Sequence, residues 1–254
     1  MALELLNYVV AYSALGIVML SLSVFVFLRN ARAPLNRIFS VYSFCIAWWS
    51  LFTIPMIINE AQAVALVWDR ICLVGAIFIP STFIHFVAVF LKKIGSWKKY
   101  VQLSYLISSL FFGLNLISCL VSEVAPVYVF RYYTIPGIYY SLFVGFFCAV
   151  STAGTILLFS NVRRIKDPRL RKQANWLSWT SLFGYVGGTI NFSLGYGIVI
   201  PGLTDIANYA VLIYGVSVAY IILKYRFLDI EVIIRRTIVF AGIAITAVCM
   251  VAIP

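Results

Sequence analysis

Long apolar stretches alternate with short polar segments along almost the whole chain. A helix needs roughly 20 apolar residues to cross a hydrocarbon core about 30 Å thick. Seven stretches and most of an eighth fit this requirement, at residues 7–28, 38–58, 67–91, 100–121, 137–160, 174–200, 207–223 and 237–254. None alternates with a period of two for long, which favours helices over the strands of a membrane barrel. The sequence therefore predicts an all-α, polytopic transmembrane helical bundle with seven complete spans and an eighth, truncated helix.

The last stretch divides the chain into two parts. It begins at Thr237 on the same side as the preceding loop and runs to Pro254 without a polar cap. We therefore expect a seven-transmembrane domain over residues 1–236, which includes a juxtamembrane segment over 224–236, followed by an eighth transmembrane helix over 237–254 that begins a further region. On this interpretation the chain is the N-terminal membrane part of a longer protein.

Composition excludes several classes of protein. Hydrophobic residues make up 63% of the chain and charged residues 11%, with a mean hydropathy of +1.03. Ordinary soluble domains have about 45–50% apolar and about 25% charged residues. A water-soluble enzyme, a disordered chain and a disulfide-stapled secreted module are therefore excluded. The five cysteines lie in apolar stretches without CxxC spacing, so we expect them to act as small hydrophobic residues.

The net charge of +11 has an explanation that needs no nucleic acid. Seventeen of the 19 Lys and Arg residues follow the first, third, fifth or seventh span, and only Arg70 and Arg131 remain for the other side. Basic loops are typically cytoplasmic, so the N-terminus is predicted to be extracytoplasmic. The lipid bilayer is then the expected partner, with its anionic head groups at the cytoplasmic loops.

Motifs for chemistry are missing from the sequence. It has no HExxH, GxSxG or Walker-type motif, and its four aspartates lie at span ends or in loops. We therefore predict no catalytic residue, no metal site and no cofactor within these residues. Transporters usually carry ionisable groups at mid-membrane, and here His85 is the one candidate. A small secondary transporter or channel subunit remains the alternative function.

Polar and aromatic side chains gather at a similar depth in the predicted outer half of the bundle. Together they suggest an extracytoplasmic pocket for a small-molecule or lipid ligand, although for each residue alone hydrogen bonds between helices or an aromatic belt are the favoured explanation. The candidate sensing residues are Trp68, Asp69, Arg70, Asn115, Tyr139, Tyr140, Asn191 and Tyr196.

Two further features concern the interior of the predicted bundle. Pro80 removes a backbone donor from the third span, which favours a bend there, and His85 lies about one turn later. His85 is interpreted either as a neutral imidazole bonded to a neighbouring helix or as a polar relay. Gly184 and Gly188 form a small-xxx-small face that favours packing within the bundle and also allows a homodimer.

Three stretches resemble the N-terminal seven-transmembrane region of bacterial sensor histidine kinases. The first runs from Asn36-Arg37-Ile38-Phe39 into Ala47-Trp48-Trp49-Ser50-Leu51. The second is Trp68-Asp69-Arg70, followed by Gly75-Ala76-Ile77-Phe78-Ile79-Pro80 and Phe83-Ile84-His85-Phe86. The third is Tyr225-Arg226-Phe227-Leu228-Asp229-Ile230 with Ile234-Arg235-Arg236-Thr237. Together the resemblance extends over about residues 7–237.

The resemblance implies a receptor module in a bacterial inner membrane that passes a stimulus to cytoplasmic kinase domains absent from this chain. Such a module is part of a two-component system. Transmission is then expected along the third span through Pro80 and His85. The expected receiver is the juxtamembrane segment, which is otherwise interpreted as a basic loop. Its candidate residues are Tyr225, Arg226, Asp229, Arg235 and Arg236.

Overall fold

The structure is a computed structural model that describes residues 2–200 and 202–224. This part of the chain contains seven helices and one two-stranded hairpin. The helices are α1 (Ala2–Arg29), α2 (Pro34–Ile58), α3 (Gln62–Phe90), α4 (Ile94–Leu116), α5 (Tyr140–Val162), α6 (Pro168–Gly195) and α7 (Leu203–Lys224), and the strands are β1 (Val121–Val127) and β2 (Phe130–Pro136). The predicted eighth helix at 237–254 and the predicted receiver segment at 225–236 lie outside the described residues.

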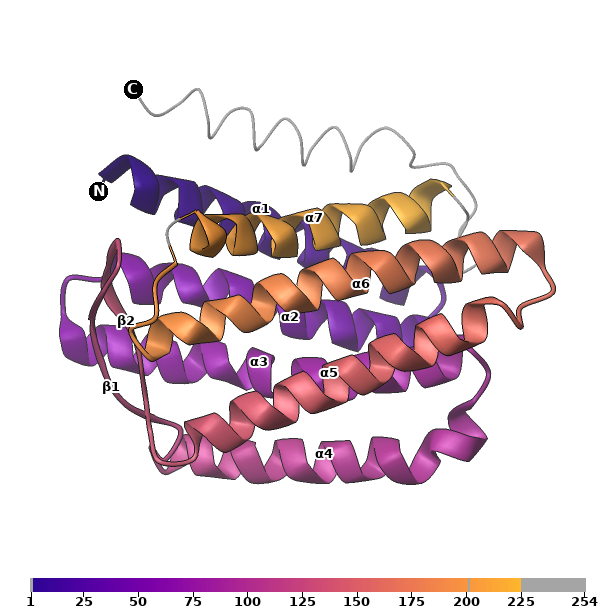
Figure 1. The fold of residues 1–254 in the computed structure, drawn as a ribbon, viewed down its shortest axis with the longest axis horizontal. Helices are drawn as coiled ribbons and strands as arrows, with labels where there is room; N and C mark the ends of the chain where they lie inside the picture. The colour runs from indigo at the N-terminus through magenta and orange to yellow at the C-terminus, as the bar shows by residue number, and fades with distance from the viewer. Residues whose placement is uncertain (1, 201, 225–254) are drawn as a thin grey trace.

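Successive helices run in opposite directions along the bundle and enclose a common core (Figure 1). Six of them form a ring in which each helix packs on the next, in the order α1, α2, α3, α5, α6, α7 and back to α1. Helix α4 lies outside this ring against α3. Helix α3 is the most buried of the candidate membrane spans because α2, α4 and α5 all pack on it. The hairpin covers one end of the ring, where β2 contacts α2, α3 and α6.

Seven helices appear close to the seven predicted positions, but they differ in their suitability as membrane spans. Among the described residues, α1, α2, α3 and α5 are long and apolar enough to cross a membrane. The apolar part of α7, Tyr209–Ile221, is shorter. Helix α6 begins six residues before the predicted start at 174 and so includes three cations, and α4 ends five residues before the predicted end at 121. The prediction of seven complete spans is therefore supported only in part.

The hairpin is a feature that the all-α prediction omitted. Its strands pair antiparallel from Val121 opposite Pro136 to Val127 opposite Phe130, with irregular register at two places. These irregularities remove the strict two-residue alternation by which a strand is recognised. The connection also lacks the usual Asn-Gly or Asp-Gly signal of a hairpin turn. The positive φ of the turn, +56°, is adopted by Tyr128 instead, a residue type that rarely takes this conformation. The sequence pattern therefore gave no indication of this element.

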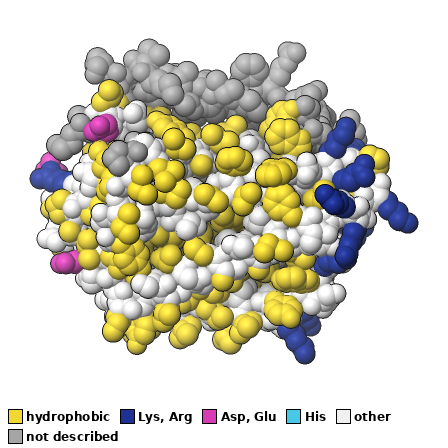
Figure 2. All heavy atoms as spheres, in the orientation of Figure 1, with side chains coloured by type: hydrophobic (Ala, Val, Ile, Leu, Met, Phe, Trp, Pro, Cys, Tyr) yellow, Lys and Arg dark blue, Asp and Glu magenta, His cyan; other side chains and the backbone are white. Residues whose placement is uncertain are grey.

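Charge separates the two ends of the bundle. The end opposite the hairpin carries the described Lys and Arg side chains of the α1–α2, α3–α4 and α5–α6 connections (Figure 2). Acidic groups and Arg131 lie at the hairpin end. Between the two ends the surface shows many apolar side chains, among them Leu103, Leu106 and Leu110 of α4. The surface thus has the apolar band and the one-sided basic loops that a membrane requires.

Glycine permits close helix contacts at two points inside the bundle. A Cβ atom on Gly75 of α3 would lie 2.6 Å from the carbonyl oxygen of Cys45 in α2. A Cβ atom on Gly184 of α6 would lie 2.7 Å from the Cβ of Tyr214 in α7. Gly184 therefore packs within the bundle, as the first interpretation of the small-xxx-small face predicts. Gly188 differs, because a Cβ added there would have no atom within 4 Å.

Candidate functional site

Asp69 is the centre of the candidate site, and the structure places it in the interior. It lies about two turns into α3, because this helix begins five residues before the predicted span start at 67, and its side chain is fully buried rather than at a span end. Among the described residues it is the only charged side chain that is buried. Its Oδ1 accepts a hydrogen bond of 2.9 Å from Thr134 Oγ1 and a weak one of 3.8 Å from Cys72 Sγ. Its Oδ2 has no hydrogen-bond partner.

Asn191 of α6 also carries polar atoms without a hydrogen-bond partner. Its side chain is buried, and both Oδ1 and Nδ2 are without a hydrogen bond. Its backbone carbonyl accepts a 3.1 Å hydrogen bond from the hydroxyl of Tyr133 in β2. Burial raises the pKa of Tyr133 well above its usual range, so this hydroxyl keeps its proton and remains a donor.

These two side chains line one cavity, which we call the polar cavity. Its volume is about 30 Å³, enough for a small polar group, since a water molecule needs about 10–15 Å³. Its lining comes from α1, α2, α3, α5, α6 and the hairpin: Tyr12, Trp49, Thr53, Met56, Asp69, Cys72, Leu73, Tyr133, Thr134, Tyr140, Gly188, Asn191 and Phe192.

A second cavity of about 50 Å³ adjoins the first deeper in the bundle, and we call it the apolar cavity. The two cavities share Trp49, Gly188 and Phe192. The other residues that line the apolar cavity are Tyr42, Ile46, Ala76, Ile79, Phe147, Gly184, Tyr185, Val211 and Tyr214.

Three tyrosines on the wall of the apolar cavity link helices on opposite sides of the ring. The hydroxyl of Tyr42 in α2 lies 3.0 Å from that of Tyr185 in α6 and 2.5 Å from that of Tyr214 in α7. These hydrogen bonds satisfy hydroxyl groups that would otherwise be buried without partners. A ligand that occupied both cavities would therefore extend from the polar cavity to this tyrosine cluster.

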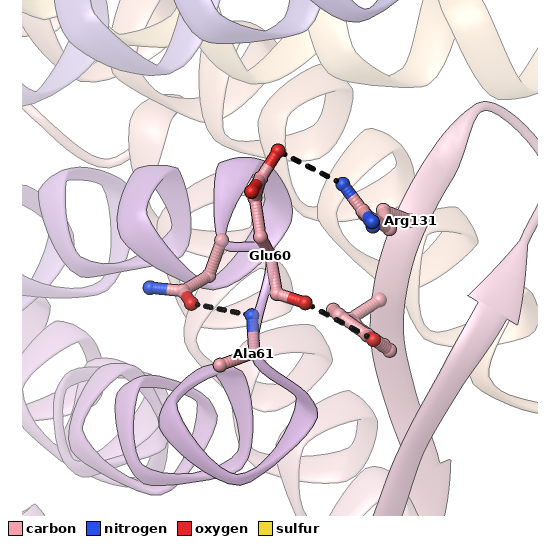
Figure 3. Close-up of polar contacts among 5 residues, drawn as sticks. Glu60, Ala61 and Arg131 are labelled. Atoms are coloured by element: carbon pink, nitrogen blue, oxygen red, sulfur yellow. Dashed lines mark hydrogen bonds and ion pairs between the residues drawn. The ribbon is translucent and has the colours of Figure 1, made fainter.

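The hairpin is fixed to the bundle at its outer edge as well as through Asp69. Arg131 Nη1 lies 3.2 Å from Glu60 Oε1 in the α2–α3 connection, and the hydroxyl of Tyr132 donates to the Glu60 carbonyl at 3.4 Å (Figure 3). Gln62 Nε2 donates to the carbonyl of Val124 at 2.8 Å. These contacts hold β2 so that Tyr133 and Thr134 face the helices.

The structure brings together three of the eight candidate sensing residues. Asp69, Tyr140 and Asn191 line the polar cavity, whereas the other five do not. Asn115 donates to the carbonyl of Arg70 at 2.9 Å, which is the hydrogen bond between helices that the alternative interpretation predicts.

The remaining candidates lie at the periphery of the site. The ring of Trp68 stacks on Phe52 at 5.7 Å. The hydroxyl of Tyr196 lies 2.7 Å from Ser141 Oγ, and Tyr139 is exposed. None of these residues lines the polar cavity.

The residues proposed for transmission have ordinary packing roles in α3. His85 Nδ1 lies 3.2 Å from the hydroxyl of Tyr105 in α4, so the predicted bond to a neighbouring helix is present. Pro80 is buried within the helix and leaves the carbonyl of Ala76, four residues earlier, without its helical donor. Ser108 of α4 donates at 2.8 Å to the next carbonyl, that of Ile77. The role in signalling stays a prediction.

Several residues of the site could not be chosen from the sequence. Thr134 and Tyr133 belong to the hairpin, which had no recognisable pattern. Tyr12 and Phe192 look like any other aromatic residue of an apolar helix. Gly188 was noted as a packing residue, although it lines both cavities.

A comparison with protein families gives a match over nearly the whole chain. The family described as "N-terminal 7TM region of histidine kinase" matches residues 11–231. The chain belongs to this family. No curated protein and no solved structure matches it. As a histidine-kinase 7TM region, the chain is a helical membrane bundle, and the buried polar cavity at its hairpin end is its candidate functional site.

Proposed function

We propose that this 7TM region is the sensory module of a histidine kinase and that its stimulus acts at the polar cavity. The observation that carries the proposal is the unpartnered state of Asp69 Oδ2 and of the Asn191 amide, two buried side chains that line one cavity. Buried polar groups without hydrogen bonds are costly and therefore rare, unless a ligand or a change of state supplies the partner.

A ligand between these groups would act on two helices at once. Asp69 belongs to α3 and Asn191 to α6, which stand on different sides of the ring. A stimulus is transmitted only if it favours one of two arrangements of the bundle over the other. Contacts to both helices give a bound molecule that preference. Helix α3 would carry the change through Pro80 and His85, and α6 would carry it through α7 toward the juxtamembrane segment.

The orientation of the bundle completes the proposal. The N-terminus and the hairpin lie outside, and the basic end lies in the cytoplasm against anionic lipid head groups of a bacterial inner membrane. Single cysteines at positions 32, 95, 167 and 205 of a cysteine-free variant test this with a membrane-impermeant maleimide. Intact cells are expected to be labelled at position 205 only, and inverted vesicles at the other three. Labelling of intact cells at 167 but not at 205 would reverse the topology.

Filling the cavity tests whether the stimulus acts there. In the complete kinase, Gly188→Leu should place an apolar side chain in both cavities, since a Cβ at Gly188 meets no atom within 4 Å. We expect the basal autophosphorylation rate to shift by about fivefold or more, because allosteric coupling typically amounts to about 1–3 kcal/mol. The rate is measured in membranes with radiolabelled ATP.

Gly145→Leu is the matched control. Gly145 lies on the exposed face of α5 and also has no atom within 4 Å of an added Cβ, but it lines neither cavity. It should leave the rate unchanged at equal membrane expression. If Gly188→Leu behaves like Gly145→Leu, the cavity is not the place where the stimulus acts.

A further inference from the structure

We propose that the polar cavity binds a small protonated amine, with the ammonium group between Asp69 and Asn191 and its apolar part in the apolar cavity. This inference rests on the proposed function in that it names the ligand class of the same site. Three observations point to it: the charge of the site, its aromatic lining and its shape.

The first observation is a buried acid with one oxygen that has no hydrogen-bond partner. In the part of the chain that the structure describes, the charge of Arg70 acts on Asp69 without a direct ion pair or hydrogen bond to Oδ2, and Arg70 does not line the cavity. Thr134 supplies one strong hydrogen bond to Oδ1, and Oδ2 has none. A buried carboxylate needs an opposite charge or several donors. An ammonium group supplies both, and the free Oδ1 of Asn191 can accept another of its protons.

The second observation is the aromatic lining around this acid. Five rings line the polar cavity, from Tyr12, Trp49, Tyr133, Tyr140 and Phe192. The face of an aromatic ring attracts a cation, with Trp the strongest, and the attraction increases when the cation is removed from water. Carboxylate and rings together therefore select a cation. An anion would be repelled by Asp69, and a neutral alcohol would bring no positive charge to Oδ2.

The third observation is the junction between the two cavities. The polar cavity has a volume of about 30 Å³, and beyond Trp49, Gly188 and Phe192 the apolar cavity adds about 50 Å³. This space suits one ammonium group and a short alkyl chain. A zwitterionic amino acid does not fit, because its carboxylate would meet either Asp69 or the apolar wall.

Binding is tested with the complete kinase in lipid nanodiscs. Methylamine and n-butylamine, both protonated at pH 7.5, are titrated beside methanol, n-butanol and n-butyrate in an isothermal calorimeter. We expect n-butylamine to bind more tightly than methylamine, because its alkyl chain enters the apolar cavity, and the neutral and anionic analogues to give no saturable binding. Asp69→Asn should weaken n-butylamine binding by about tenfold or more, since a hydrogen bond to a charged group contributes about 1.5–3 kcal/mol.

Two further variants make the result decisive. Glu123→Gln removes an exposed acid of β1 at the same end of the bundle and should leave the dissociation constant unchanged. Asn191→Ala deletes two atoms that have no partner, so it should fold normally and still weaken the binding of n-butylamine. Equal binding of n-butanol and n-butylamine, or full binding by Asp69→Asn, would overturn the inference. The absence of amine binding would also overturn the inference. If Gly188→Leu still altered kinase output, the proposed sensory function would remain without this ligand class. Amine binding with an unaltered output from Gly188→Leu would support the ligand class and reject the sensory role of the cavity.

Discussion

Gly75→Ala is expected to destabilise the bundle by about 1–3 kcal/mol, the usual cost of overpacking. The added Cβ would lie 2.6 Å from the carbonyl oxygen of Cys45 and 2.7 Å from the backbone nitrogen of Trp49. Both atoms belong to the backbone of α2, so no flexible side chain can move aside, and α2 and α3 must separate. The loss should exceed the roughly 1 kcal/mol that alanine gains over glycine in helix propensity. Reversible unfolding in mixed micelles measures it.

Gly113→Ala is the matched control for this prediction. Gly113 lies on the exposed face of α4, and a Cβ there meets no atom within 4 Å. The control should unfold at the same detergent fraction as the parent or a slightly higher one. Equal stability of both variants would show that the close approach of α2 and α3 does not constrain the bundle.

Most helices could be predicted because the membrane imposes a simple requirement on them. A spanning segment must satisfy its own backbone groups and be about 20 residues long, so hydropathy alone located all seven described helices with ends within six residues. The cation pattern also predicted which connections share an end, since the Lys and Arg side chains of the α1–α2, α3–α4 and α5–α6 connections gather at the end opposite the hairpin (Figure 2). Helix boundaries were less predictable where polar residues continue a helix beyond the apolar region, as at the start of α6.

The site was predicted only in part because its formation depends on tertiary contacts. Asp69 and Asn191 were recognisable as polar residues at similar depth, and this property does place them in one cavity. Asn115 has the same sequence signal but bonds to a backbone carbonyl instead. The rotation of each helix about its axis decides between these outcomes, and apolar residues all around a membrane helix leave that rotation unspecified. Thr134 depends in addition on an irregular hairpin register.

Thr134→Val tests the bond between the hairpin and the core. The substitution keeps the shape of the side chain but removes the one strong hydrogen bond that Asp69 receives from the described side chains. A buried acceptor left without a partner costs about 1–3 kcal/mol, and more when it is charged. We therefore expect a loss of at least this size, measured by the same unfolding assay. Arg131→Ala removes the exposed pair with Glu60 at the other edge of β2 and should cost less than about 1 kcal/mol.

A second substitution in the same pair identifies the cause of this loss. If the cost of Thr134→Val comes from the stranded carboxylate, then removing the carboxylate as well should recover stability, because replacing both partners of a buried hydrogen bond by apolar groups of similar shape is nearly neutral. The double variant Thr134→Val/Asp69→Leu is therefore expected to be more stable than Thr134→Val alone, a coupling that a double-mutant cycle measures directly. If the two losses simply add, the hairpin contributes through packing, and the bond to Asp69 has no special weight. Recovery of stability would mean that the bundle retains a costly buried acid that its fold does not need.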